Sequence, residues 1–166
     1  SEMCIRDRAR TQNHIEPETA RALAGHGNIA GIKDSGGAQD TLEAYLAVGR
    51  EVEGFAVYSG PDHLVHWSLQ NGAAGCISGL GNVLPEVLAG IIRAFNAGDQ
   101  AEAARQQEIF GNFRKDLYGL GYPPALVKRA LFLMDSSVGA SRQPALLPDP
   151  AQDEKIREIL VKYELV

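Results

Sequence analysis

The stretch NIAGIKDSGG, residues 28–37, decides the fold class of this chain. A short apolar run ends at Lys33, and small polar residues and two glycines follow it at once. An apolar run of this length between turn residues is typical of a buried β-strand. We therefore predict a strand over residues 28–33, with the lysine at its carboxyl end.

The same pattern recurs twice further along the chain. Short apolar runs over residues 54–58 and 74–78 are each followed by a loop that contains glycine. Helical patterns separate the runs, and strands that alternate with helices through short connections favour a parallel sheet. The sequence therefore predicts an α/β fold. The predicted helices of this part cover residues 17–24, 41–48, 62–69 and 85–96.

No strand pattern follows residue 82, and the rest of the chain is helical in pattern, over residues 99–117, 123–134 and 153–163. The last of these helices carries mixed charges on one face, which predicts a solvated cap. Three strands suit either a doubly wound sheet with more strands or a (β/α)₈ barrel, which needs about 250 residues. Both interpretations lead us to expect further strands upstream of residue 9.

Composition excludes several classes of protein. The 166 residues are 45% hydrophobic and 22% charged, which is typical of a globular domain. Sixteen basic against 21 acidic residues give a net charge of −5, which argues against a nucleic-acid partner. No apolar run approaches the roughly 20 residues of a membrane span. Two cysteines make no disulfide framework, so we expect a cytoplasmic protein.

Lys33 is the most informative candidate for chemistry. A lysine at the carboxyl end of a buried parallel strand lies where barrel active sites are built. Burial disfavours its charged form, and the free amine can attack a ketone to form a Schiff base. The alternative is a strand-end lysine that reaches into solvent. His63 and His66 have no acidic or cysteine ligand at metal-site spacing, so we predict no metal.

The two later loops should open on the same face as Lys33. Gly60 permits close approach of the backbone to a ligand, and Asp62 can either accept hydrogen bonds from a substrate or cap the following helix. Glycines also cluster over residues 75–82, GCISGLGN, which suggests another close backbone approach. The turn at residues 119–124 is interpreted as a structural connection only.

Together these motifs resemble the dihydrodipicolinate synthase and N-acetylneuraminate lyase superfamily of class I, Schiff-base aldolases. The resemblance rests on NIAGIKDSGG, on YSGPD at residues 58–62, on GCISGLGNVLPE at residues 75–86, and on GYPPALVK at residues 121–128. It implies the C-terminal portion of a TIM barrel, strands six to eight, followed by a helical extension. The implied organisation is a partial barrel over 9–97 and a helical region over 98–166. Residues 1–8 have no helical or strand period and resemble a translated adapter sequence, so we expect a non-native segment there, with a frayed native N-terminus as the alternative.

The resemblance also implies the site. Lys33 is the expected Schiff-base lysine, and Arg10 is expected at the pocket mouth. The family's strand-five tyrosine and its carboxylate-binding pair are expected upstream of Ala9. The expected substrate-binding residues are Ser59, Gly60, Asp62, His63, Ile77, Ser78 and Gly79.

The implied function is cleavage or formation of a C–C bond of a 2-oxo acid by a pyruvate-dependent aldolase. The expected small-molecule partners are a 2-oxo acid and an aldehyde. No metal or organic cofactor is expected. The resemblance also implies a homo-oligomer, namely a tetramer. The motifs KDSGG and SGLGNV favour the sugar-acid and hydroxy-oxoglutarate branches. The alternatives are 4-hydroxy-tetrahydrodipicolinate synthase, and an inert half-barrel that needs a partner.

Overall fold

A computed structural model describes residues 14–166. Its sheet has three parallel strands in the order β1 (Gly31–Asp34), β2 (Ala56–Ser59) and β3 (Gly75–Cys76). The predicted α/β alternation is confirmed. The third strand is shorter than predicted, because Cys76 pairs with Ser59, the last residue of β2, and the chain then has no strand beside it. Arg10 and the segment 1–8 lie outside the described residues.

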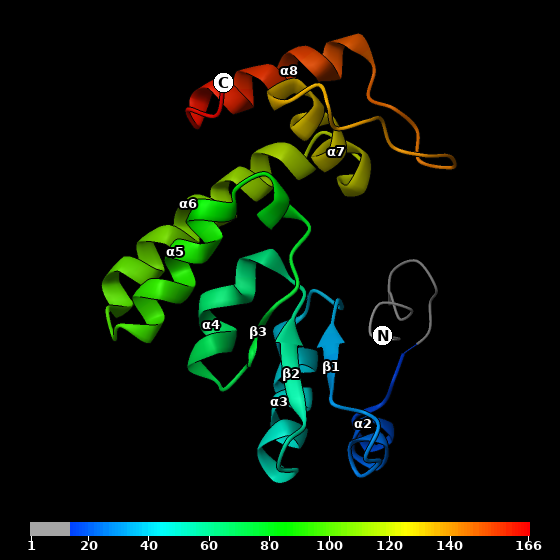
Figure 1. Ribbon diagram of the computed structural model, residues 1–166, viewed down its shortest axis with the longest axis vertical. Coiled ribbons are helices and arrows are strands. Elements are labelled where there is room, and N and C mark those ends of the chain that lie inside the picture. The colour runs from blue at the N-terminus through cyan, green and yellow to red at the C-terminus, as the bar shows by residue number, and fades with distance from the viewer. Residues whose placement is uncertain (1–13) are drawn as a thin grey trace.

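In Figure 1, α3 and α4 lie beside the strands, whereas α5 to α8 extend away from the sheet beyond the carboxyl ends of the strands. Three of the helices, α2, α5 and α7, have the predicted bounds, and each has proline in its first turn, where the missing N–H is not needed. The helices are α2 (Pro17–Ala24), α3 (Gln39–Glu51), α4 (Val65–Gln70), α5 (Pro85–Asn96), α6 (Gln100–Tyr118), α7 (Pro123–Met134) and α8 (Pro150–Lys162), with 3₁₀ turns η1 (Asp62–Leu64) and η2 (Leu80–Asn82).

Two clusters of buried apolar side chains hold the molecule together. The sheet-side cluster joins β1 and β2 to α3, through Ile32, Val57 and Leu42 among others. The helical cluster joins α5, α6, α7 and α8, and Ile156 and Leu160 of α8 are fully buried in it. The prediction that the last helix is a solvated cap is therefore wrong, because the apolar face of this helix is part of the core.

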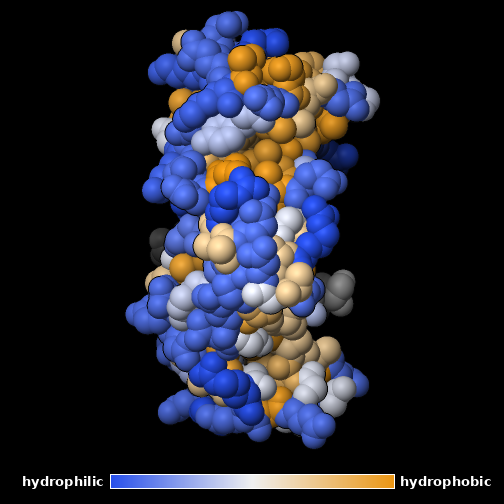
Figure 2. Space-filling model, turned by 90° about the vertical axis from the view of Figure 1, so that its left-hand side faces the viewer, coloured by the Kyte–Doolittle hydropathy of each residue, from blue (hydrophilic) through white to orange (hydrophobic). Residues whose placement is uncertain are grey.

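The distribution of apolar residues on the surface also differs between the two ends of the molecule. One face of the molecule gathers apolar atoms at the end where α7 and α8 lie, and is largely hydrophilic elsewhere (Figure 2). Among residues 14–166, no helix has both the length and the apolar character that crossing a bilayer requires.

Candidate active site

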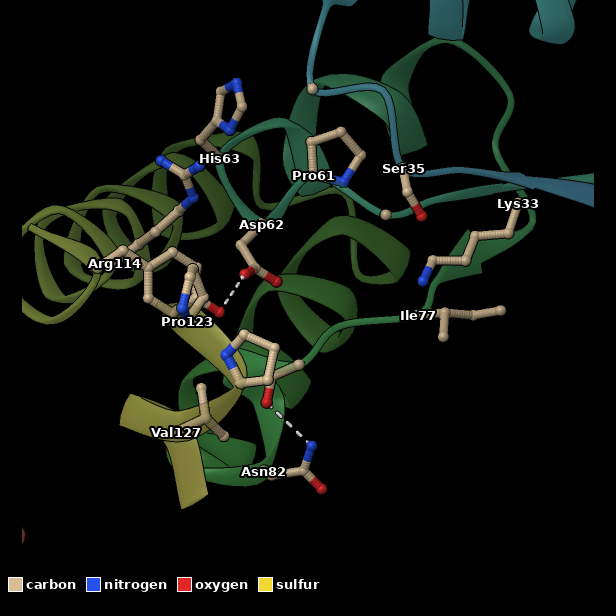
Figure 3. A pocket seen from close by; sticks show the side chains of 15 residues that line it. Lys33, Ser35, Pro61, Asp62, His63, Ile77, Asn82, Arg114, Pro123 and Val127 are labelled. Atoms are coloured by element: carbon tan, nitrogen blue, oxygen red, sulfur yellow. Dashed lines mark hydrogen bonds between the residues drawn. The ribbon is translucent and has the colours of Figure 1, made fainter. Parts of the chain in front are cut away.

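A cavity of about 580 Å³ lies at the carboxyl ends of the strands (Figure 3). One wall comes from β1 and the loops that follow β2 and β3, and the other wall comes from α6 and the start of α7. Six of the residues predicted for the site line this cavity: Lys33, Gly60, Asp62, His63, Ile77 and Gly79.

Strand alternation places the lysine. Ile32 and Asp34 are buried, whereas Lys33 between them is only half-buried and its side chain lines the cavity. Gly60 lies against it, since the Gly60 amide donates to the Asp34 carbonyl oxygen at 2.7 Å. A Cβ at Gly60 would lie 2.2 Å from that oxygen and 2.9 Å from Lys33 Cε. Glycine is therefore required for the loop after β2 to approach the end of β1 this closely.

Asp62 is the most constrained polar side chain of the site and is only 5% exposed. Ser78 Oγ donates to its Oδ1, and the Tyr118 hydroxyl donates to its Oδ2 at 3.2 Å. Burial raises the pKa of Asp62, while the two hydrogen bonds act in the opposite direction. Its carboxylate caps no helix, because neither η1 nor α4 has a side-chain cap. The capping alternative is wrong, and the side chain belongs to the cavity.

His63 and Arg114 lie beyond Asp62 (Figure 3). Burial and the nearby charge of Arg114 lower the pKa of His63, against opposing effects of Asp62 and of a backbone hydrogen bond with Gly37. The imidazole is therefore neutral at pH 7. Burial and the charge of Asp62 raise the pKa of Tyr118, so its phenol stays a hydrogen-bond donor.

Two further predicted residues, Ser59 and Ser78, do not line the cavity themselves. Ser78 bonds Asp62 and also accepts from the Gly81 amide at 2.8 Å. Ser59 is fully buried, and its hydroxyl donates to the Pro61 carbonyl at 3.3 Å. A direct contact of these two side chains with substrate remains a prediction. Arg10 falls in the part of the chain that the structure does not describe.

The helical wall was not predicted. Arg114 and Tyr118 come from α6, and Pro123 and Pro124 come from the turn that was interpreted as a structural connection only, which is wrong. Gln107 of α6 fixes this wall, because its Nε2 donates to the Asp62 carbonyl at 3.0 Å. Positions 107, 114 and 118 share one face of a helix, so their spacing predicts a common face but not the element that this face contacts.

Within residues 14–166, no group of three or more His, Cys, Asp or Glu side chains is arranged to hold a metal ion. Cys76 is a half-buried free thiol, and burial raises its pKa. The polar side chains that line the cavity are those of Lys33, Ser35, Asp62, His63, Asn82, Arg114 and Tyr118.

Comparison with known proteins identifies the family. The model of the dihydrodipicolinate synthetase family matches residues 6–162. This chain belongs to the dihydrodipicolinate synthetase family. The predicted superfamily is thereby confirmed.

Relatives within the dihydrodipicolinate synthetase family include 4-hydroxy-tetrahydrodipicolinate synthases. That of Methanoculleus marisnigri is 32% identical over 154 residues, which are 93% of this chain and 52% of the relative. That of Geobacter metallireducens is 34% identical over 158 residues, 95% of this chain and 53% of the relative. The chain spans about half the length of the curated relatives that it matches.

Solved structures of the dihydrodipicolinate synthetase family show the same arrangement. The dihydrodipicolinate synthase of Thermotoga maritima is 25% identical with a TM-score of 0.88, over 96% of this chain and 55% of that one. YagE, a prophage protein of E. coli K12 in complex with pyruvate, is 26% identical with a TM-score of 0.86, over 96% and 55%. The parallel sheet and its helices therefore superpose on about half of each family structure.

Proposed function

We propose that Lys33 forms a Schiff base with pyruvate or a longer 2-oxo acid, and that the protein makes or breaks the adjacent C–C bond. The observation that carries this proposal is the Lys33 side chain, which lines a 580 Å³ cavity at the carboxyl end of its strand. The neighbouring Gly60 leaves space for it. The pyruvate in the YagE complex supports the choice of 2-oxo acid.

The sheet is proposed to correspond to strands six to eight of a TIM barrel. The coverage of about half of each matched structure supports this assignment. The resemblance places the proton-transferring tyrosine and the carboxylate-binding pair upstream of residue 9, outside residues 14–166. The proposed activity therefore requires a protein in which these groups are also present.

The chemistry requires only an amine and proton transfers. The neutral Lys33 amine attacks C2 of the 2-oxo acid, and loss of water gives an iminium. Loss of a proton from C3 gives an enamine, whose C3 attacks the aldehyde carbonyl and forms the new C–C bond. Hydrolysis then frees the lysine and the product, and the reverse sequence cleaves the bond.

Asp62 is proposed to orient the aldehyde end. Each carboxylate oxygen accepts more than one hydrogen bond, so Oδ1 and Oδ2 retain acceptor capacity beside Ser78 and Tyr118. A hydroxyl of the substrate, or of the newly formed alcohol, can donate to them. The hydrogen bonds from two different elements keep the carboxylate in one orientation.

Two substrate classes are candidates. The motifs KDSGG and SGLGNV favour aldolases of sugar acids and hydroxy-oxoglutarate, whereas the names of the matched relatives favour condensation of pyruvate with aspartate semialdehyde. Product formation from pyruvate with a panel of aldehydes, aspartate semialdehyde included, distinguishes the two. A tetramer remains a prediction, for which sedimentation analysis is the test.

Borohydride trapping tests the Schiff base. Pyruvate and borohydride should add one reduced pyruvate to the Lys33 peptide, and Lys33→Ala should abolish the adduct. Lys115→Ala is the matched control, since Lys115 is exposed on α6 and does not line the cavity. An adduct that persists in Lys33→Ala and is lost in Lys115→Ala would contradict the proposal.

The half-barrel alternative is tested in the same experiment. Among the described residues, β1 and β3 each have one unpaired edge, at which a further strand could bind. Trapping is therefore repeated on a fusion that adds the N-terminal half of the Thermotoga maritima synthase. Trapping in the fusion alone would identify a half-barrel that needs a partner. Absence of a Lys33 adduct from both proteins would refute the Schiff base.

A further inference from the structure

Arg114 is a half-buried cation that lines the cavity without an ion-pair partner. Within residues 14–166 it makes no salt bridge and no hydrogen bond, and its contact is with the Tyr118 ring, 5.4 Å from Cζ to the ring centroid. Arg105, on the same helix, pairs instead with Glu102 at 2.7 Å. A partly desolvated guanidinium without a counter-ion favours an anion beside it.

No acidic side chain among residues 14–166 forms a direct ion pair or hydrogen bond with Arg114. His63 beside it is neutral at pH 7, for the reasons given above. The Asp62 carboxylate acts on Arg114 only through space, since its hydrogen bonds come from Ser78 and Tyr118. The cavity therefore has a free cationic group next to a neutral imidazole.

Arg114 lies at the opposite end of the cavity from Lys33. In Figure 3 the lysine enters from one side, Arg114 and His63 lie on the other, and Asp62 is between them. Gln107 holds α6 in this position by bonding the Asp62 carbonyl at 3.0 Å and the His66 amide at 2.8 Å. These two hydrogen bonds hold Arg114 at the end of the cavity away from Lys33.

We propose that Arg114 binds a carboxylate or phosphate at the far end of the substrate. The site then selects 2-oxo acids, or aldehydes, that carry an anionic group distant from the reacting carbonyl. This inference rests on the proposed function for the position of that carbonyl, next to Lys33. The planar guanidinium can form two parallel hydrogen bonds to either oxyanion.

Binding to the Lys33→Ala chain tests the inference without Schiff-base chemistry. The first pair of probes is 2-oxoglutarate and 2-oxopentanoate, which have the same chain length and differ in the distal carboxylate. The second pair is glyceraldehyde 3-phosphate and glyceraldehyde. Calorimetry gives a dissociation constant for each probe, and the ratio within a pair is compared between Arg114→Gln and the control Arg105→Gln, both in the Lys33→Ala background.

We expect the anionic member of at least one pair to bind about tenfold more tightly than its neutral partner. Arg114→Gln should bring that ratio close to one, and Arg105→Gln should leave it unchanged. A ratio above one for the first pair identifies a carboxylate, and for the second pair a phosphate. Ratios near one in both pairs, absence of binding, or ratios that Arg114→Gln does not change would overturn the inference.

The proposed function fails separately. If the anionic probe binds through Arg114 but no 2-oxo acid gives a borohydride adduct at Lys33 in the unsubstituted chain, the anion site stands and the Schiff base does not. If adducts form but the ratios stay near one, the Schiff base stands and the role of Arg114 is refuted. Thermal unfolding of Arg114→Gln and Arg105→Gln, compared first, shows that both variants are folded.

Discussion

The two walls of the cavity are built in different ways. On the sheet wall, Lys33 and Gly60 are placed by backbone: parallel strands end at one edge, and the loops after them meet there. On the helical wall, Arg114 and Tyr118 are placed by side-chain packing of α6 against η1, more than 40 residues away in sequence. The sheet wall therefore tolerates few changes of backbone, whereas the helical wall can vary in its side chains.

The two apolar clusters repeat this contrast. The sheet-side cluster lies between strands and α3, whereas the helical cluster depends on helices that cross one another. The short segment of η1 and α4 connects them, because Leu64 belongs to the first cluster and Val65 to the second. Changes in either cluster should show how far each wall depends on the other.

The largest effect is expected in the helical cluster, from Phe113→Ala. Phe113 is fully buried and meets the Tyr163 ring edge-on, with centroids 4.9 Å apart, so it joins α6 to the end of α8. Truncation should lower the free energy of unfolding by about 4 kcal/mol. Urea denaturation measures the loss, and hydrogen exchange should show it mainly in α5–α8. Equal loss of protection in β1 and β2 would show that the clusters are one unit.

The next effect concerns the sheet wall, where Gly60→Ala places a Cβ 2.2 Å from the Asp34 carbonyl oxygen. Backbone must shift to relieve this contact, which should cost about 3 kcal/mol. Because Lys33 Cε lies 2.9 Å from the same Cβ position, borohydride trapping should also slow. Unchanged stability and trapping would show that the close approach is not needed.

A smaller effect, on the pH dependence of the free energy of unfolding, tests the environment of Asp62, which accepts a hydrogen bond from Tyr118 on the helical wall. Burial raises the pKa of Asp62 above the value of about 4 expected in the unfolded chain, so the folded state binds this proton more tightly. The free energy of unfolding should therefore fall as pH rises from about 4 through the folded pKa. Asp62→Asn lacks this titration, so the stability of the unsubstituted chain relative to the variant should fall over the same range.

Tyr118→Phe sharpens that test. It removes a hydrogen bond that favours the Asp62 carboxylate, so the pKa of Asp62 should rise further and the pH window should extend upward. Urea denaturation at a series of pH values measures both variants. A relative stability that stays level, or that increases with pH, would mean that burial does not dominate at Asp62.

The smallest effect is expected from Gly111→Ala, the counterpart of Gly60→Ala on the helical wall. A Cβ at Gly111 meets nothing within 4 Å, and the residue lies inside α6. Alanine should therefore raise the free energy of unfolding by about 0.5–1 kcal/mol, because glycine has the larger conformational entropy in the unfolded chain. A destabilised variant would indicate that this face of α6 is packed against something further.

The sequence was informative where local rules decide the structure. Proline marked the starts of α2, α5 and α7, and glycine followed the ends of α2 and α5. The apolar run before Lys33 identified β1, which begins three residues later than predicted and ends one residue after the lysine. Strand order then brought Lys33, Gly60 and Ile77 to one cavity without any knowledge of packing.

Sequence reasoning failed where distant elements meet. Nothing local to Arg114 or Tyr118 shows that α6 lies against Asp62, and the contact depends on Gln107 bonding the Asp62 backbone. The same limit applies to α8, whose charges suggested a solvated helix while Ile156 and Leu160 were fully buried. Asp62 itself was predicted with two roles, and only its tertiary neighbours decide between them.

A crystal structure of the protein with pyruvate, or of the fusion if only the fusion is trapped, decides whether Lys33 forms the Schiff base. We expect continuous density between Lys33 Nζ and C2 of pyruvate, within the cavity that Gly60 and Asp62 line. Pyruvate bound without a covalent bond to Lys33, or density for an adduct at another lysine, would contradict this expectation.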